Sequence, residues 1–247
     1  MKDFLKKNTK AVVILGVITA LLVWGWCSAS SIIMAMLTGG SPADDVALEA
    51  MKASNMCETG DAITFNSEGT QTGFIFYPGG MVNPAAYAPM MKTVSDAGFL
   101  TVIVKMPLQL AVLNSNLADK VMEQHPEIEH WYLGGHSLGG VTACMYADRH
   151  RDKLEGLILL AAYSTKDLKD SGLKVLSLYG SEDKVLNMER YAAGKKRLPE
   201  EFREIVIEGG CHGYMGNYGE QVMDGIPTIS REEQQTQVIE AILEMIR

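Results

Sequence analysis

The sequence predicts an α/β fold, in which a doubly wound, mostly parallel β-sheet is covered by helices on both faces. Short apolar segments rich in β-branched residues alternate along the chain with longer segments of helical periodicity. Turns that contain glycine lie at the ends of these apolar segments. The segments are apolar without interruption, which is typical of strands that are buried on both faces. No internal repeat or low-complexity tract interrupts the alternation, so we expect one domain with an N-terminal appendage.

The composition excludes several classes of protein. The chain has 247 residues and a formal net charge of -8, and a basic cluster of four lysines lies at the extreme N-terminus. Without a Lys/Arg cluster that could neutralise a run of phosphates, we expect no nucleic-acid partner. The four cysteines show neither C-x-x-C nor metal-ligand spacing, which predicts no metal site, no other cofactor and no disulfide framework. A single pairing of Cys57 stays open.

An apolar segment near the N-terminus predicts a membrane anchor. Four lysines lie within residues 1–10, and no charged residue then occurs before Asp44. The apolar run over residues 11–37 exceeds the roughly 20 residues that span a bilayer and the core of a signal peptide. The lysines place the N-terminus in the cytoplasm and the rest of the chain outside. The alternative is a secreted protein, because Ser28-Ala29-Ser30 resembles a signal-peptide cleavage site.

The first elements of the domain follow the anchor in order. Residues 41–60 read as a polar linker with a first helix, and residues 61–66 as an early edge strand. The continuous apolar strand Gly73-Phe-Ile-Phe-Tyr77 ends at Pro78-Gly79-Gly80. Further along, the pattern predicts a helix over 83–98, a strand over 99–104 and a helix over 108–123. The helix over 83–98 carries Tyr87, Met90, Met91 and Val94 on one apolar stripe.

A nucleophile motif lies at the centre of the chain. Gly135-His136-Ser137-Leu138-Gly139 matches the pattern G-x-S-x-G, in which a serine occupies a sharp turn between a strand and a helix. The backbone of that serine is strained, so the residues two positions away must be nearly free of side chain. A strand over 130–135 and a helix over 138–151 flank the turn, and we therefore predict that Ser137 is a nucleophile. The inner face of that helix is expected to carry Val141, Cys144, Met145 and Ala147.

The segments after the motif continue the alternation of strands and helices. They predict strands over 154–161, 173–178 and 202–208, and helices over 188–197 and 231–247. This alternation implies a mostly parallel sheet that is covered by helices on both faces.

A serine nucleophile needs an imidazole base and a carboxylate that orients the imidazole. In a sheet of this kind the chain order is serine, acid, histidine. Among the five histidines, only His212 lies downstream on a loop, where flanking glycines let its ring reach over the sheet edge. The acid is expected after the preceding strand, where Asp183 occupies the usual position and Glu182 is the alternative. Cys211 is disfavoured as a rival nucleophile, because adjacent loop residues point in different directions.

Attack on a carbonyl group creates an oxyanion, which two preorganised backbone N–H groups must stabilise. Leu138, the residue after the nucleophile, is expected to supply one of them. The other is expected from the turn after the Gly73–Tyr77 strand, where glycines let the backbone approach a substrate. Gly80 and Met81 are both candidates for that second donor.

The order of these elements resembles the α/β-hydrolase superfamily. Three phrases are similar to the small lid-less α/β-hydrolase fold-5 family: Phe76-Tyr-Pro-Gly-Gly80, Lys105-Met-Pro-Leu108 and Gly216-Asn-Tyr-Gly219. The resemblance covers residues 61–247 and implies a sheet of the eight-stranded type, a triad of Ser137, Asp183 and His212, and ester-type substrates. Two features depart from commoner esterases. Pro78 replaces the histidine of a His-Gly pair, and residues 162–172 are too few for a cap domain.

Together these features predict a domain organisation and a function. Residues 1–40 would form a cytoplasmic tail and membrane anchor, 41–60 a linker and first helix, and 61–247 an α/β-hydrolase catalytic domain. We expect an extracytoplasmic serine hydrolase of the carboxylesterase or lipase-like kind that acts on small-molecule or lipid-like esters through an acyl-enzyme. The alternatives are acyl transfer or peptide hydrolysis on cell-envelope material, and a catalytically idle domain that binds a partner beside the membrane.

Overall fold

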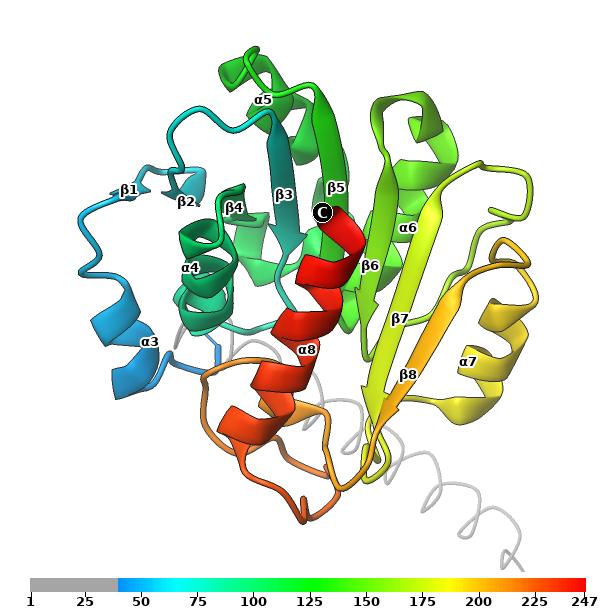
Figure 1. Ribbon diagram of the computed structural model, residues 1–247. Helices are drawn as coiled ribbons and strands as arrows, with labels where there is room; N and C mark the ends of the chain where they lie inside the picture. Colours follow the sequence, from blue (N-terminus) through cyan, green and yellow to red (C-terminus); the bar gives the residue numbers. More distant parts are fainter. Residues whose placement is uncertain (1–39) are drawn as a thin grey trace, which may run out of the picture. The chain divides into compact units, whose positions relative to one another are not determined.

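The computed structural model describes residues 40–247, of which residues 41–247 form one compact unit. At the centre of this unit lies an eight-stranded sheet with the strand order β1-β2-β4-β3-β5-β6-β7-β8 (Figure 1). The pairings β1–β2 and β2–β4 are antiparallel, and all pairings from β4 to β8 are parallel. The predicted mostly parallel sheet is confirmed. The strands are β1 (Met56–Glu58), β2 (Ala62–Phe65), β3 (Thr72–Tyr77), β4 (Leu100–Val104), β5 (His130–His136), β6 (Gly156–Leu160), β7 (Lys174–Gly180) and β8 (Arg203–Ile207).

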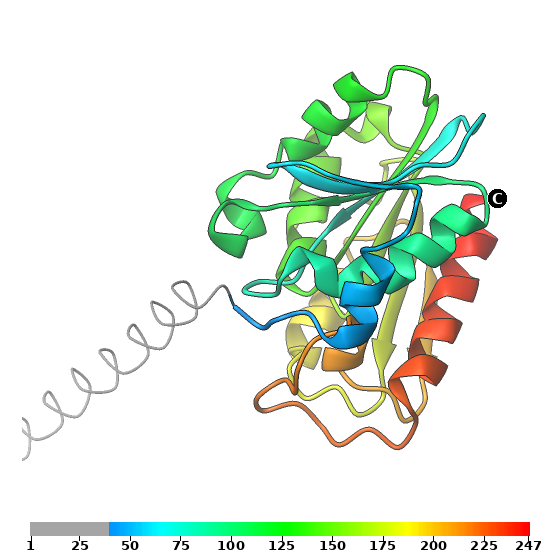
Figure 2. The ribbon, with the colours of Figure 1, turned by 90° about the vertical axis from the view of Figure 1, so that its left-hand side faces the viewer.

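Helices cover both faces of the sheet (Figure 2). They are α3 (Asp45–Ala50), α4 (Ala88–Asp96), α5 (Leu117–Gln124), α6 (Leu138–Arg149), α7 (Met188–Lys195) and α8 (Arg231–Ile246). Because alternate strand residues point to opposite faces, Phe76 of β3 packs with Met91 of α4 and Ile242 of α8 in one apolar core. The neighbouring residue, Tyr77, belongs to the second core with Ala143 of α6. The doubly wound arrangement is therefore confirmed.

The predicted membrane anchor, its cytoplasmic tail and the alternative cleavage site all fall within residues 1–39, outside the described residues. Within residues 40–247, no helix has the length and apolar character that a membrane crossing requires. The segment predicted as a linker and first helix, residues 41–60, contains α3 and β1.

The helix predicted over residues 108–123 is wrong in its first half. Pro107–Gln109 and Ala111–Leu113 form two short 3₁₀ turns, and α5 begins only at Leu117. Leu108 and Gln109 have φ angles of 51° and 55°, which a right-handed helix excludes. The carbonyl oxygen of Gln109 accepts a hydrogen bond from the N–H group of Met81 at 3.0 Å, so this segment follows the turn after β3 rather than a helical path.

Two further elements differ from the sequence prediction. The expected edge strand is β2, but the three-residue strand β1 pairs with it and forms the actual edge. In α6 the predicted Cys144 and Ala147 are buried, whereas Val141 and Met145 are only half-buried. The deepest positions instead include Gly140, where a Cβ atom would lie 2.5 Å from the Cβ atom of Ala162. This close approach of α6 to the chain after β6 selects small residues that an apolar pattern does not reveal.

Candidate active site

Ser137 lies on the turn between β5 and α6, as the motif predicts. Its φ angle of 51° is in the left-handed region, which costs free energy for any residue other than glycine. The turn is fixed on both sides, because the Ser137 N–H group donates to the Leu160 carbonyl oxygen at 2.9 Å and the Ser137 carbonyl oxygen accepts from Val141 at 3.1 Å. The strained conformation is thus stabilised by β6 and by the first turn of α6.

The glycines of the motif are required by close backbone contacts. A Cβ atom at Gly135 would lie 2.6 Å from the carbonyl carbon of Gly139. A Cβ atom at Gly139 would overlap the carbonyl oxygens of Tyr77 and Pro78, at the end of β3. The nucleophile turn and the turn after β3 are therefore in direct backbone contact, which brings Ser137 next to the segment expected to hold an oxyanion donor.

His212 and Asp183 are joined by a hydrogen bond. His212 follows β8, Asp183 follows β7, and the distance from His212 Nδ1 to Asp183 Oδ2 is 2.8 Å. The other carboxylate oxygen of Asp183 accepts hydrogen bonds from the N–H groups of Val185 at 2.9 Å and Leu186 at 2.7 Å. Both side chains of the His212–Asp183 pair are almost fully buried. A carboxylate held in this way fixes Nδ1 as the protonated nitrogen and leaves Nε2 free to accept a proton.

Glu182, the alternative acid, does not contact His212. Among the described residues its carboxylate accepts a hydrogen bond only from the hydroxyl of Ser181, at 3.4 Å, and Glu182 is half-buried. The geometry therefore favours Asp183 as the partner of His212.

Ser137 and His212 line the same cavity, which has a volume of about 270 Å³. It lies at the carboxyl ends of the parallel strands, where open α/β sheets bind their ligands. In the described part of the chain, the Ser137 hydroxyl makes no hydrogen bond with the His212 ring, so the expected direct contact is absent here. Catalytic hydrogen bonds are often loose without substrate, and a shared cavity is the arrangement that substrate binding can tighten.

A larger cavity, of about 680 Å³, lies near Lys174 and Arg203 at the amino ends of β7 and β8. None of the predicted site residues lines it. The smaller cavity is the relevant one, because it combines a nucleophile, a base and an apolar wall. That wall consists of Leu138, Val141, Ala161, Ala162, Val185 and Leu186, with Tyr163, Asn187 and Arg190 also lining the cavity.

The two candidates for the second oxyanion donor differ in their hydrogen bonds. The Met81 N–H group already donates to the Gln109 carbonyl oxygen. By contrast, the N–H groups of Gly80 and Leu138 have no acceptor among residues 40–247. Gly80 is also adjacent to Leu138, since a Cβ atom on Gly80 would lie 3.0 Å from Leu138 Cδ2. The structure therefore favours Gly80 over Met81 as the partner of Leu138.

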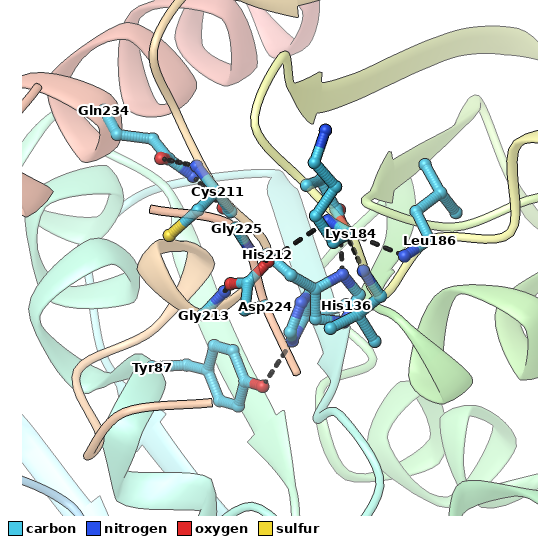
Figure 3. A network of polar contacts seen from close by, with 12 residues as sticks. Tyr87, His136, Lys184, Leu186, Cys211, His212, Gly213, Asp224, Gly225 and Gln234 are labelled. Atoms are coloured by element: carbon cyan, nitrogen blue, oxygen red, sulfur yellow. Dashed lines mark hydrogen bonds and ion pairs between the residues drawn. The ribbon is translucent and has the colours of Figure 1, made fainter. Parts of the chain in front are cut away.

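Two side chains that the sequence prediction missed hold the loops of the His212–Asp183 pair (Figure 3). Gln234 of α8 accepts from the Cys211 N–H group and donates to the Cys211 carbonyl oxygen, both at 2.9 Å. Asp224 accepts from the N–H groups of Gly213 at 2.8 Å and Lys184 at 3.3 Å, and so connects the loop of His212 to the loop of Asp183. One signal was present: Gln234 is a polar residue on the buried stripe of α8.

Cys211 has the properties of a buried structural thiol. Its side chain is buried, and burial raises the pKa of its thiol to about 11. It does not line the cavity that contains Ser137. Because the thiolate is the reactive form, this environment disfavours Cys211 as a nucleophile. Within residues 40–247, no group of three or more His, Cys, Asp or Glu side chains is placed to hold a metal ion.

The chain was compared with known families and proteins. Residues 73–236 match the model of a family described as the alpha/beta hydrolase family. No curated protein sequence matches the chain closely enough to count as a relative.

Many solved structures share the fold. A carboxylesterase structure from the thaumarchaeon Nitrososphaera gargenis matches at 13% identity and a TM-score of 0.57, covering 77% of this chain and 98% of that one. The monoacylglycerol lipase of Paleococcus ferrophilus matches at 15% identity and a TM-score of 0.58, over 74% of this chain and 98% of that one. Est1E of Butyrivibrio proteoclasticus matches at 16% identity and a TM-score of 0.54, over 77% and 97%. At these identities the likeness concerns the fold.

Proposed function

Because the chain belongs to the alpha/beta hydrolase family, we propose that it is a serine hydrolase that cleaves carboxylic esters through an acyl-enzyme. The observation that carries the proposal is the cavity that Ser137 and His212 share. On its other side the His212 ring is hydrogen-bonded to Asp183, with 2.8 Å between His212 Nδ1 and Asp183 Oδ2. Structural neighbours that include a carboxylesterase and a monoacylglycerol lipase support an ester as the substrate.

In the first half of the reaction, the hydroxyl oxygen of Ser137 attacks the carbonyl carbon of the ester. His212 Nε2 accepts the hydroxyl proton, and Asp183 stabilises the imidazolium ion that forms. The carbonyl oxygen becomes an oxyanion that accepts hydrogen bonds from the N–H groups of Leu138 and Gly80. When the tetrahedral intermediate collapses, His212 returns the proton to the departing alcohol and the acyl group stays on Ser137.

In the second half, a water molecule replaces the alcohol. His212 Nε2 removes a proton from this water, whose oxygen attacks the acyl carbon, and the same two N–H groups stabilise the second oxyanion. Collapse breaks the bond to Ser137, which regains its proton from His212, and releases the carboxylic acid. The backbone of Ser137 is hydrogen-bonded on both sides and so keeps the serine side chain directed into the cavity through both halves, which lowers the cost of ordering the nucleophile.

The small cavity predicts a limit to the gain in kcat/KM from longer acyl chains. A cavity of about 270 Å³ with apolar walls gives buried surface to the first carbons of an acyl chain, and later carbons remain in water. Each buried methylene contributes about 0.8 kcal/mol and each exposed one contributes nothing, so the gain ends where the cavity ends. We therefore expect kcat/KM to rise with chain length while the added carbons fit the cavity and then to level off, so that p-nitrophenyl laurate is hydrolysed no faster than a shorter ester that already fills the cavity. The measurement is a series of p-nitrophenyl esters that differ only in chain length.

Ser137→Ala gives the background for each ester in this series, because activated esters also hydrolyse without a nucleophile. Val141→Ala enlarges the cavity and is expected to move the chain length at which kcat/KM levels off to longer chains. A rate that keeps rising up to laurate would contradict the assignment of this cavity to the acyl group.

We place the domain outside the cytoplasmic membrane, held by an N-terminal anchor. This part of the proposal rests on the sequence of residues 1–37, with its lysines followed by a long uncharged apolar run. A reporter enzyme fused after Arg247 is therefore expected to be active only outside, and protease added to spheroplasts should degrade the domain. A cytoplasmic reporter signal would contradict this topology. Mass spectrometry of the mature protein separates an anchor, which retains residues 1–30, from a cleaved signal peptide.

A further inference from the structure

His136, the variable position of the nucleophile motif, is hydrogen-bonded to a buried tyrosine. The distance from His136 Nδ1 to the hydroxyl oxygen of Tyr87 is 2.9 Å, and neither side chain is more than 1% exposed (Figure 3). The same hydroxyl oxygen accepts a hydrogen bond from the Gly79 N–H group at 3.0 Å. A chain of hydrogen bonds therefore runs from the nucleophile turn through Tyr87 to the turn after β3.

The bond between Gly79 and Tyr87 has one possible direction. The Gly79 N–H group can only donate, so the tyrosine oxygen accepts there and its hydroxyl hydrogen remains for His136. With His136 Nδ1 as its acceptor this hydroxyl hydrogen is paired, and the ring proton of His136 then lies on Nε2, which has no hydrogen-bond partner among residues 40–247. Burial, together with the neighbouring His212, holds the pKa of His136 well below its ordinary value, and burial raises the pKa of Tyr87. Both groups are thus neutral at ordinary pH.

The turn after β3 packs directly on this pair. A Cβ atom at Gly79 would lie 2.8 Å from both His136 Nδ1 and the Tyr87 hydroxyl oxygen, so only glycine fits at this position. Gly80 stands between two tethered N–H groups: that of Gly79 is bound to Tyr87, and that of Met81 is bound to the Gln109 carbonyl oxygen. The N–H group of Gly80 has no acceptor in the described chain. The hydrogen bonds of the two neighbouring residues therefore fix its orientation.

We propose that Tyr87 and His136 are positioning residues that aim the Gly80 N–H group at the oxyanion. This inference rests on the proposed function, since it assigns a task within the same site. Neither residue lines the cavity, so they act through the backbone of Gly79 rather than on the substrate. His136 also packs against the base, with 4.5 Å between the ring centroids of His136 and His212. One buried pair thus supports the oxyanion turn and contacts the base.

The first test is Tyr87→Phe, which removes the hydroxyl and keeps the ring that packs 4.8 Å from the Phe76 ring. An oxyanion donor acts mainly in the transition state, so we expect kcat for p-nitrophenyl butyrate to fall by roughly 10- to 100-fold with KM changed less than about twofold. The matched control is Tyr218→Phe. Tyr218 is equally buried and lies beside His136, but its hydroxyl has no hydrogen-bond partner in the described chain. The kcat of Tyr218→Phe should stay within about twofold of the wild-type value.

A second pair of variants tests the acceptor on His136. His136→Asn can supply an acceptor oxygen near the position of Nδ1, whereas His136→Leu fills similar volume and accepts no hydrogen bond. We expect His136→Asn to keep kcat within about fivefold of wild type and His136→Leu to lose as much as Tyr87→Phe. The double variant Tyr87→Phe/His136→Leu should be hardly worse than either single variant, because both cut one chain of bonds. If the circular-dichroism spectrum shows that Tyr87→Phe is unfolded, the comparison of kcat between His136→Asn and His136→Leu tests the proposal.

Three results would overturn the inference while wild-type activity remains dependent on Ser137. They are a wild-type kcat in Tyr87→Phe, an equal loss of kcat in Tyr218→Phe, and equal activities of His136→Asn and His136→Leu. Failure of the proposed function looks different, since the wild-type chain would then hydrolyse no ester or Ser137→Ala would hydrolyse it equally well.

Discussion

Replacing Ser137 or His212 by alanine is expected to lower kcat for an activated ester by roughly 10⁴- to 10⁶-fold. Ser137→Ala removes the attacking oxygen, and His212→Ala removes the group that accepts its proton. Because the two side chains act as one unit, the double variant should be hardly slower than either single variant. The measurement is steady-state hydrolysis of p-nitrophenyl butyrate by all three variants.

Cys211→Ala is the matched control for these variants. It changes the residue next to His212, yet its thiol lies outside the cavity and is held protonated by burial. Its kcat should stay close to the wild-type value, and all variants should keep the far-UV circular-dichroism spectrum. Substantial activity in Ser137→Ala, or losses that add across Ser137 and His212, would mean that the two residues do not share one reaction.

Asp183→Asn is expected to lower kcat by roughly 10³- to 10⁴-fold, somewhat less than loss of the nucleophile or base. The asparagine oxygen can still accept from the N–H groups of Val185 and Leu186, so the loop keeps its conformation. Its amide hydrogens, however, would face His212 Nδ1, so that the imidazole is held in the wrong tautomer. The substitution also removes the negative charge that stabilises the imidazolium ion. Stopped-flow or steady-state kinetics with the same ester measure the loss of kcat.

Glu182→Gln is the control for the acid, because Glu182 is the neighbouring carboxylate and, among residues 40–247, its carboxylate accepts a hydrogen bond only from Ser181. We expect its kcat within about twofold of wild type. The assignment of the acid would be contradicted if Glu182→Gln lost as much activity as Asp183→Asn, or if Asp183→Asn were fully active.

The fold and the placement of the three candidate site residues at one edge of the sheet could be predicted, because these positions follow from local rules. A parallel sheet puts the carboxyl ends of its strands at one edge, so residues after β5, β7 and β8 must approach each other there. The spacing of Gly135 and Gly139 around Ser137 reports the close backbone contacts that the structure contains. The match of residues 73–236 to the alpha/beta hydrolase family confirms the resemblance seen in the sequence.

Other features could not be predicted, because they depend on contacts between distant residues. Leu108 and Gln109 look like helix formers, and their positive φ angles result from the path that the chain takes around the turn after β3. The bond between Tyr87 and His136 joins residues 49 positions apart. The pattern placed Tyr87 on an apolar stripe, and a buried tyrosine hydroxyl needs a partner that periodicity cannot name.

Labelling with a fluorophosphonate tests the central claim most directly, because this reagent reacts with a serine only where a base and an oxyanion site activate the hydroxyl. The full-length chain would be incubated with the reagent, and its intact mass and peptide map measured. We predict one equivalent of label, located on Ser137, with none on Ser137→Ala and a strongly slowed reaction on His212→Ala. Label on another residue, or no label on folded wild-type protein, would contradict the assignment of Ser137 as an activated nucleophile.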